Sequence, residues 1–166
     1  AAAEARPKLL AGLKDPLPSV RAAAIRAVAS AAPAEPDLVP TLTALLDDPD
    51  APPRHAAAGQ LGHLGEAARP AQPKLFALLE RREDREVALE ALRGVKADDV
   101  ERLKAALDHG DWNVRAFGAD ALGTLGRAAE SARPRLEKSV AEDPYEDVKR
   151  AARRALRRIR EAPPAS

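Results

Sequence analysis

The sequence predicts an all-α protein, an α-solenoid of five antiparallel helix pairs. Three observations lead to this prediction. Alanine makes up roughly a quarter of the 166 residues and aromatic residues only 2%, a balance that favours closely packed helices over a sheet sandwich. Four series of residues recur in step along the chain, as in a repeat array. Within each recurrence, apolar residues follow the i, i+3, i+4 spacing of helices that face a core.

Composition excludes several classes of protein. The formal net charge is +1, which argues against a globally basic nucleic-acid binder and against an acidic tail protein. No apolar run approaches the roughly 18 residues that a membrane span needs. Cysteine is absent, which excludes disulfides, thiolate metal sites and a cysteine nucleophile. Methionine is absent even at position 1, as expected of a processed product, an interior fragment or an engineered sequence, and the localisation stays open.

The four series keep step through five units. The opening prolines are 33, 33 and 61 residues apart, and the last spacing is nearly two periods, with its missing member near Glu101. The series are Pro7, Pro40, Pro73 and Pro134; Leu13, Leu46, Leu79, Leu107 and Val140; Arg21, Arg54, Arg85, Arg115 and Lys149; and Val28, Leu61, Leu92, Leu122 and Leu156. We therefore expect one domain over residues 1–166, with approximate repeats at 5–32, 38–66, 70–96, 98–127 and 130–161.

Each unit is predicted to hold two helices. The first starts at the proline, whose fixed φ and missing N–H suit the first turn of a helix. A turn follows, marked by Asp-Pro or His-Gly-Asp at 15–16, 48–49, 109–111 and 143–144. The second helix carries an apolar face, which in the first unit comprises Val20, Ala23, Ala24, Ala27 and Val28. Gly65 and Gly126 stand where C-terminal helix caps are expected.

The proline-led first helix, the aspartate-containing turn and the Val-Arg opening of the second helix resemble HEAT repeats, in particular the bacterial subtype named after phycobilisome lyases. The resemblance covers residues 5–160. It implies a right-handed superhelix whose second helices line a concave, macromolecule-binding face. It also implies a ladder of contacts between the turn aspartate and the helix-start basic residue of different units. The candidate members are Asp15, Asp48 and Asp143 with Arg21, Arg54, Arg115 and Lys149.

Repeat three departs from this pattern. Its turn, Arg81 to Arg85, is two residues shorter than the others and lacks both Asp-Pro and the valine. We therefore expect the ladder to weaken at this unit, with a local change of curvature.

No catalytic site, metal site or cofactor is predicted. His55 and His63 are eight residues apart on one helix, which is about 12 Å at 1.5 Å per residue and too far for one shared metal ion. His109 lies in a turn two units further on. The glycines at 59, 62 and 65 fall at the end of a helix, where the dipole disfavours phosphate. No nucleophile–histidine set or phosphate loop is present.

Base-excising DNA glycosylases built from HEAT-like repeats are an alternative that the residues support weakly. Such an enzyme needs a cleft with aromatic side chains and a carboxylate. Here Trp112 is the only tryptophan. Asp120 is predicted on the concave face, where an acidic side chain is usually only solvated.

The predicted concave stripe takes offsets two, five, six and nine of each second helix. It is small in units two and four, acidic in unit three and basic at the end, and such mixed signs suit a protein or peptide better than a nucleic-acid groove. Its candidate partner-binding residues are Arg26, His55, Glu86, Glu90, Arg93 and Asp120. Its small and apolar members are Ala22, Ile25, Ala58, Gly59, Leu89, Ala116 and Ala119.

The last predicted helix is strongly polarised. One side is apolar, with Val148, Ala152, Ala155, Leu156 and Ile159. The other side is basic, and its candidate anion-binding residues are Lys149, Arg150, Arg153, Arg154, Arg157 and Arg158, with Arg160 beyond them. This face suits the docking of phosphates, anionic lipid or an acidic protein, and equally the polar cap that a terminal repeat needs.

Trp112 and Tyr145 occupy equivalent turn positions, 33 residues apart, so stacking should place them on one edge. They are candidates for partner binding, because these residue types are enriched at interface hot spots. A plug between neighbouring units is the interpretation that the repeat pattern favours.

These observations together predict a non-catalytic protein-binding scaffold, either a segment of a longer protein or a subunit of an assembly. A protein or peptide partner is favoured, and no small-molecule substrate is implied. The first alternative is an electrostatic module that binds nucleic acid or an anionic membrane through the last helix. The second is a lyase-like or enzyme-accessory role, implied only by the name of the HEAT subtype.

Overall fold

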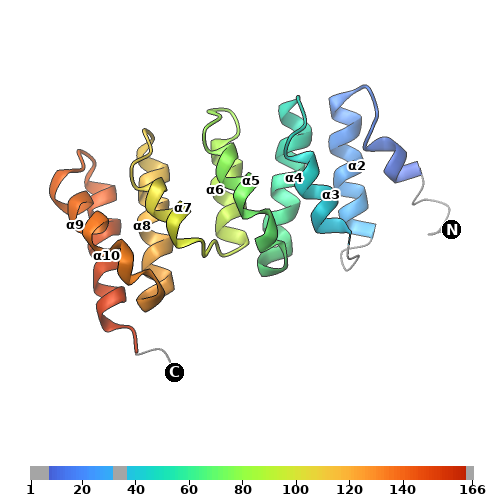
Figure 1. Ribbon diagram of the computed structural model, residues 1–166. Coiled ribbons are helices and arrows are strands. Elements are labelled where there is room, and N and C mark those ends of the chain that lie inside the picture. Colours follow the sequence, from blue (N-terminus) through green and yellow to red (C-terminus); the bar gives the residue numbers. More distant parts are fainter. Residues whose placement is uncertain (1–7, 32–36, 164–166) are drawn as a thin grey trace. The chain divides into compact units, whose positions relative to one another are not determined.

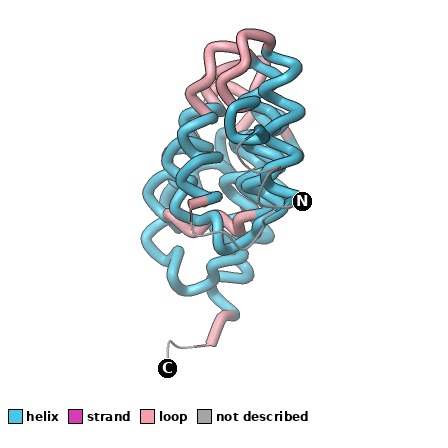
Figure 2. The backbone as a smooth tube through the Cα atoms, turned by 90° about the vertical axis from the view of Figure 1, so that its right-hand side faces the viewer, coloured by secondary structure: helices cyan, strands magenta, loops and turns pink. Residues whose placement is uncertain are grey.

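A computed structural model of the protein describes residues 8–31 and 37–163. Within these ranges the backbone forms helices, turns and loops and no strand (Figure 2), so the predicted all-α helical repeat fold is confirmed. None of the described helices is long and apolar enough to span a bilayer. Pro7 and the two ends of the first predicted repeat lie outside the described residues. The chain divides into two compact units, Ala1–Ala97 and Asp98–Ser166.

The first unit holds the first three repeats (Figure 1). Its helices, after a helical stretch at 8–12, are α2 (Pro18–Ala31), α3 (Leu38–Leu45), α4 (Ala51–Leu64), the 3-10 helix η1 (Gly65–Ala71), α5 (Gln72–Leu78) and α6 (Arg85–Gly94). The second helices of the repeats pack in order, α4 against both α2 and α6. The first helices form the other layer, with α3 on α4 and α5 on α6.

The second unit repeats this arrangement with two helix pairs. It comprises α7 (Val100–Ala106), α8 (Trp112–Leu125), the 3-10 helix η2 (Gly126–Ala132), α9 (Arg133–Glu142) and α10 (Glu146–Glu161). The second helices α8 and α10 pack against each other, α7 packs on α8, and α9 packs on α10.

The prolines and glycines mark helix boundaries as the sequence predicts. Pro40 lies in the first turn of α3, and Pro73 and Pro134 are the second residues of α5 and α9. At the other end, Gly65 caps α4 with a φ of +63° and Gly126 caps α8 with a φ of +57°. A left-handed φ is costly for any residue with a Cβ, so glycine at these two positions lets the chain turn sharply from α4 into η1 and from α8 into η2.

Leucine, isoleucine and valine side chains form the core of each unit. The members of the two recurring apolar series in the outer repeats, Leu13, Val28, Val140 and Leu156, are only half-buried. The large, fully buried side chains of the first unit include Ile25, Leu42, Leu46, Leu61, Leu75 and Leu92. Those of the second include Leu103, Val114, Leu122, Leu136 and Ile159. Repeating one buried position in every helix gives each pair a shared core with its neighbours, which is how repeat proteins acquire stability.

Part of the apolar face predicted for the first unit is exposed, so that prediction is wrong for two residues. Val20 is 37% exposed, and Ala23 is exposed as well. The equivalent residues of α8, Val114 and Phe117, are buried.

Candidate functional site

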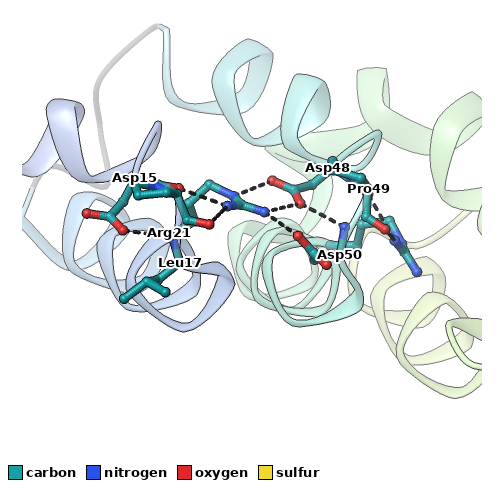
Figure 3. A network of polar contacts seen from close by, with 8 residues as sticks. Asp15, Leu17, Arg21, Asp48, Pro49 and Asp50 are labelled. Atoms are coloured by element: carbon teal, nitrogen blue, oxygen red, sulfur yellow. Dashed lines mark hydrogen bonds and ion pairs between the residues drawn. The ribbon is translucent and has the colours of Figure 1, made fainter.

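A ladder of arginine–aspartate contacts joins successive repeats (Figure 3). Arg21 of α2 donates two hydrogen bonds to Asp48 of the next turn, both at 2.8 Å, and a third to Asp50 at 2.7 Å. Its Nη1 donates to the carbonyl oxygens of Asp15 and Pro16 at 2.8 and 3.2 Å. The Arg21 hydrogen bond lowers the pKa of Asp48 below its ordinary value. Arg21 is therefore fully engaged in holding two turns together.

The second rung lies deeper and corrects the expectation for repeat three. Arg54 donates to Asp84 from Nε at 2.7 Å and from Nη2 at 3.0 Å, while its Nη1 donates to the carbonyl oxygens of Asp48 and Pro49. The Asp84 side chain is fully buried and that of Arg54 is 2% exposed. Although repeat three lacks Asp-Pro, Asp84 supplies the missing carboxylate, so the ladder does not weaken between repeats two and three.

Burial and hydrogen bonding act in opposite directions on Asp84. Burial by itself raises the pKa of the carboxyl, but hydrogen bonds from Arg54 and His55 outweigh it, and the pKa lies below its ordinary value. The Nε2 of His55 lies 2.8 Å from Asp84 Oδ1. His55, a candidate partner-binding residue, is therefore engaged by the ladder although 39% of its side chain is exposed.

The second unit holds a third rung. Arg115 donates to Asp143 at 2.7 and 3.2 Å, and its Nη1 donates to the carbonyl oxygens of His109 and Gly110. Lys149 occupies the same position in the last repeat, and within the described residues it forms no ion pair with a carboxylate. The three complete rungs use their arginines structurally, whereas the ammonium group of Lys149 only attracts the carboxylates of Asp143 and Glu146 through its charge.

The two aromatic residues of the second unit lie together, as their spacing predicts. The rings of Trp112 and Tyr145 are stacked, with centroids 5.9 Å apart and planes 13° from parallel. The guanidinium of Arg115 lies 5.5 Å from the Tyr145 centroid. Trp112 is half-buried, whereas Tyr145 is 49% exposed. One ring face is thus used within the unit while much of Tyr145 stays open to a partner.

The predicted concave stripe is only partly a surface. Its charged candidates Arg26, Glu86, Glu90 and Arg93 are exposed. Asp120 is half-buried and accepts two hydrogen bonds from Arg154, at 3.0 and 3.2 Å. The residues at offset five, together with Ala22, are buried. The prediction that they form part of the concave surface is therefore wrong. They are Ala22, Ile25, Ala58, Leu89 and Ala119.

The arginines of helix α10 are exposed to solvent, and its apolar side is buried where the helix packs on α8 and α9. Val148, Ala152, Ala155 and Ile159 are buried as predicted, and Leu156 is half-buried. Ion pairs hold the arginines of the first three turns: Arg150 with Asp147, Arg153 with Glu146 and Arg154 with Asp120. The last turns differ, because Arg157, Arg158 and Arg160 form no ion pair within the described residues.

The basic side of α10 corresponds to the packing side of α8. In α8, Ala119 is fully buried, and a Cβ built on Gly123 would lie 2.7 Å from the Cα of Ala155. Small residues on this side therefore let α10 approach closely. The residues 34 positions later, in the same register of α10, are Arg153 and Arg157, and both are exposed.

The first unit shows the same packing side. A Cβ on Gly62 of α4 would lie 3.0 Å from the Cα of Ala91 in α6. Glycine at this register lets a neighbouring second helix approach α4 and α8 closely, whereas α6 and α10 carry Arg93 and Arg157 there. The described ranges contain no group of three or more histidine, aspartate or glutamate side chains that could hold a metal ion.

Stacked helix pairs, shared leucine positions and a ladder of buried ion pairs define a helical repeat protein. The chain belongs to the HEAT-repeat family: the family model matches residues 6–96 and 72–157. A search of curated proteins found no match.

Two solved structures are similar to the chain. One is the complex of CpcE and CpcF of phycocyanin lyase from Nostoc sp. PCC7120, with 28% identity and a TM-score of 0.66, over 93% of this chain and 65% of that chain. The other is an engineered protein, with 22% identity and a TM-score of 0.61, over 92% of this chain and 78% of that one. The family match and the first structure confirm the resemblance to HEAT repeats of the phycobilisome-lyase type.

Proposed function

We propose that the protein is a non-catalytic scaffold that binds an acidic segment of another protein through the basic side of α10. The observation that carries the proposal is the change at two register positions, from the small residues Ala119 and Gly123 in α8 to Arg153 and Arg157 in α10. A helix that only caps the array could carry charges of either sign. In α10, however, every charged residue between Asp147 and Glu161 is a lysine or an arginine.

The free arginines decide where the partner docks. Arg157 and Arg158 carry no ion pair within the described residues, and Lys149 repeats the ladder position of Arg115 without an aspartate of a following turn within those residues. A partner carboxylate beside Lys149 would continue the ladder. Charge-assisted hydrogen bonds from arginine to carboxylate are stronger than neutral ones and geometrically specific.

A protein partner fits the rest of the molecule better than a nucleic acid does. The net charge is only +1, and three arginines of α10 are already neutralised by carboxylates. A nucleic-acid module would instead extend its positive surface over several repeats. The exposed ring of Tyr145 adds an apolar contact of the kind that protein interfaces use.

The test is capture from an extract of the source organism, with protein and nucleic acid both quantified at low and high salt. The variant carries Arg153→Ser, Arg157→Ser and Arg158→Ser. The matched control carries the same loss of charge on exposed basic residues of the first unit: Lys14→Ser, Arg81→Ser and Arg82→Ser. We expect one stoichiometric protein to bind the parent and the control but not the variant, and the purified partner to rebind. Capture of nucleic acid alone, lost at high salt, would contradict the proposal.

A role as a subunit of a lyase is a second candidate, because the similar structure is a complex of two proteins of phycocyanin lyase. In that case the captured partner would itself be a HEAT-repeat protein. The pair, but neither protein alone, would then support lyase activity on phycocyanin.

A further inference from the structure

A pocket in the second unit lies outside the basic side of α10 described above. It is formed where η2 meets the last turns of α10 and has a volume of about 500 Å³, within the range of small-ligand sites. The residues that line it are Arg127, Glu130, Arg133, Ile159 and Arg160. We refer to it as the η2–α10 pocket.

The lining carries three positive charges and one negative charge. Glu130 and Arg133 form an ion pair at 3.0 Å, and the hydrogen bond that Arg133 donates to Glu130 raises the pKa of Arg133. The charges of Glu130 and Arg133 therefore cancel. The remaining excess of two positive charges belongs to Arg127 and Arg160, neither of which has a carboxylate partner within the described residues.

Arg127 is held in place before any ligand arrives. Its Nε donates a hydrogen bond of 2.8 Å to the carbonyl oxygen of Ala162, which follows the end of α10. Only Nε is used by this bond, so both Nη groups remain available. The backbone is close here as well, because a Cβ on Gly126 would lie 3.0 Å from that of Ala162. A guanidinium fixed in this way loses little conformational entropy on binding.

We propose that the η2–α10 pocket binds a small phosphate monoester through Arg127 and Arg160. A phosphate monoester carries nearly two negative charges at pH 7 and has three strong acceptor oxygens. It therefore matches the excess of two positive charges, which a single carboxylate does not. Guanidinium groups bind phosphate oxygens in pairs of hydrogen bonds. The protein-binding variant proposed above changes Arg153, Arg157 and Arg158, none of which lines this pocket, so either proposal can fail alone.

Isothermal titration calorimetry at constant ionic strength tests the proposal on the full chain, with inorganic phosphate and glycerol 3-phosphate as probes. We expect saturable binding of both near one site per chain. Arg127→Gln and Arg160→Gln should each weaken it by about tenfold, because each removes a charge-assisted contact. Arg150→Gln is the matched control, since this α10 arginine pairs with Asp147 away from the pocket, and it should leave the affinity unchanged.

The dependence on pH separates recognition of a dianion from diffuse attraction. Phosphate loses its second proton near pH 6, so its affinity should rise between about pH 5 and about pH 7.5, while that of sulfate stays constant. Far-UV circular dichroism confirms folding, and Arg160→Lys, which keeps the charge, should bind more weakly than the parent. Absence of saturable phosphate binding, equal weakening by Arg150→Gln, or binding only to phosphatidic-acid vesicles would each overturn the proposal.

Discussion

Replacing Asp84 with asparagine tests whether the buried ladder stabilises the fold as its geometry implies. The side chain keeps its size but loses its charge, and Arg54, which is 2% exposed, is left without its carboxylate. Removing one partner of a buried ion pair costs about 3 to 5 kcal/mol. Glu83 cannot compensate, because it is 61% exposed and 3.5 Å from Arg54. We therefore expect Asp84→Asn to lower the free energy of unfolding by about 3 to 5 kcal/mol.

Urea unfolding at pH 7, followed by far-UV circular dichroism, measures this change. The control is Glu101→Gln, whose exposed pair with Lys104 should contribute less than about 0.5 kcal/mol. A double variant, Arg54→Met with Asp84→Leu, removes both charges and should recover most of the loss, and it remains informative if the single variant fails to fold. A loss below about 1 kcal/mol for Asp84→Asn would refute the reasoning.

The same carboxylate predicts how the parent responds to acid. The folded pKa of Asp84 is lowered by its hydrogen bonds, and the unfolded value is about 3.9. Its contribution is therefore fully present above about pH 4 and is lost as the pH falls through the folded pKa. An acid titration should show a shallower loss of stability in Asp84→Asn than in the parent.

Further predictions concern packing. Gly123→Ala places a Cβ against the backbone of Ala155 and should destabilise by about 1 to 3 kcal/mol. Gly59→Ala meets nothing within 4 Å in the same kind of helix and should stabilise by about 0.5 to 1 kcal/mol, so equal effects in chemical denaturation would contradict the packing argument. Tyr145→Ala uncovers Trp112, and its fluorescence should shift to longer wavelength; an unchanged spectrum would argue against the stacked geometry.

Much of the fold could be predicted because each signal is local. A proline in the first turn of a helix and a glycine at its end act through their own φ angles, and the leucine spacing fixes which side of a helix is buried. The 61-residue offset between Gly65 and Gly126 therefore predicted two equivalent caps. The 3-10 helices that follow the caps were not predicted, since nothing in the repeat spacing separates them from the next α-helix.

The candidate site was harder to predict because it depends on contacts between repeats. Asp84 is not part of an Asp-Pro pair, so the turn pattern that marks Asp48 and Asp143 did not identify it as a member of the ladder. The stripe at offset five was misassigned for a related reason. In a stacked array the neighbouring second helix covers that position, as Ala58 and Ala119 show, and a helical wheel of one helix contains no information about its neighbour.

The same reasoning explains why α10 differs from the other second helices. The covered second helices α4 and α8 carry glycine at offset nine, because backbone approaches backbone at Gly62 and Gly123. At the same offset α10 carries Arg157, whose long side chain does not allow so close an approach of backbones. A partner on this side must then contact long, charged side chains rather than backbone, and it must supply carboxylates to do so. Under the proposed function, the long arginine side chain that prevents such close packing on α10 is also the group that would bind an acidic partner.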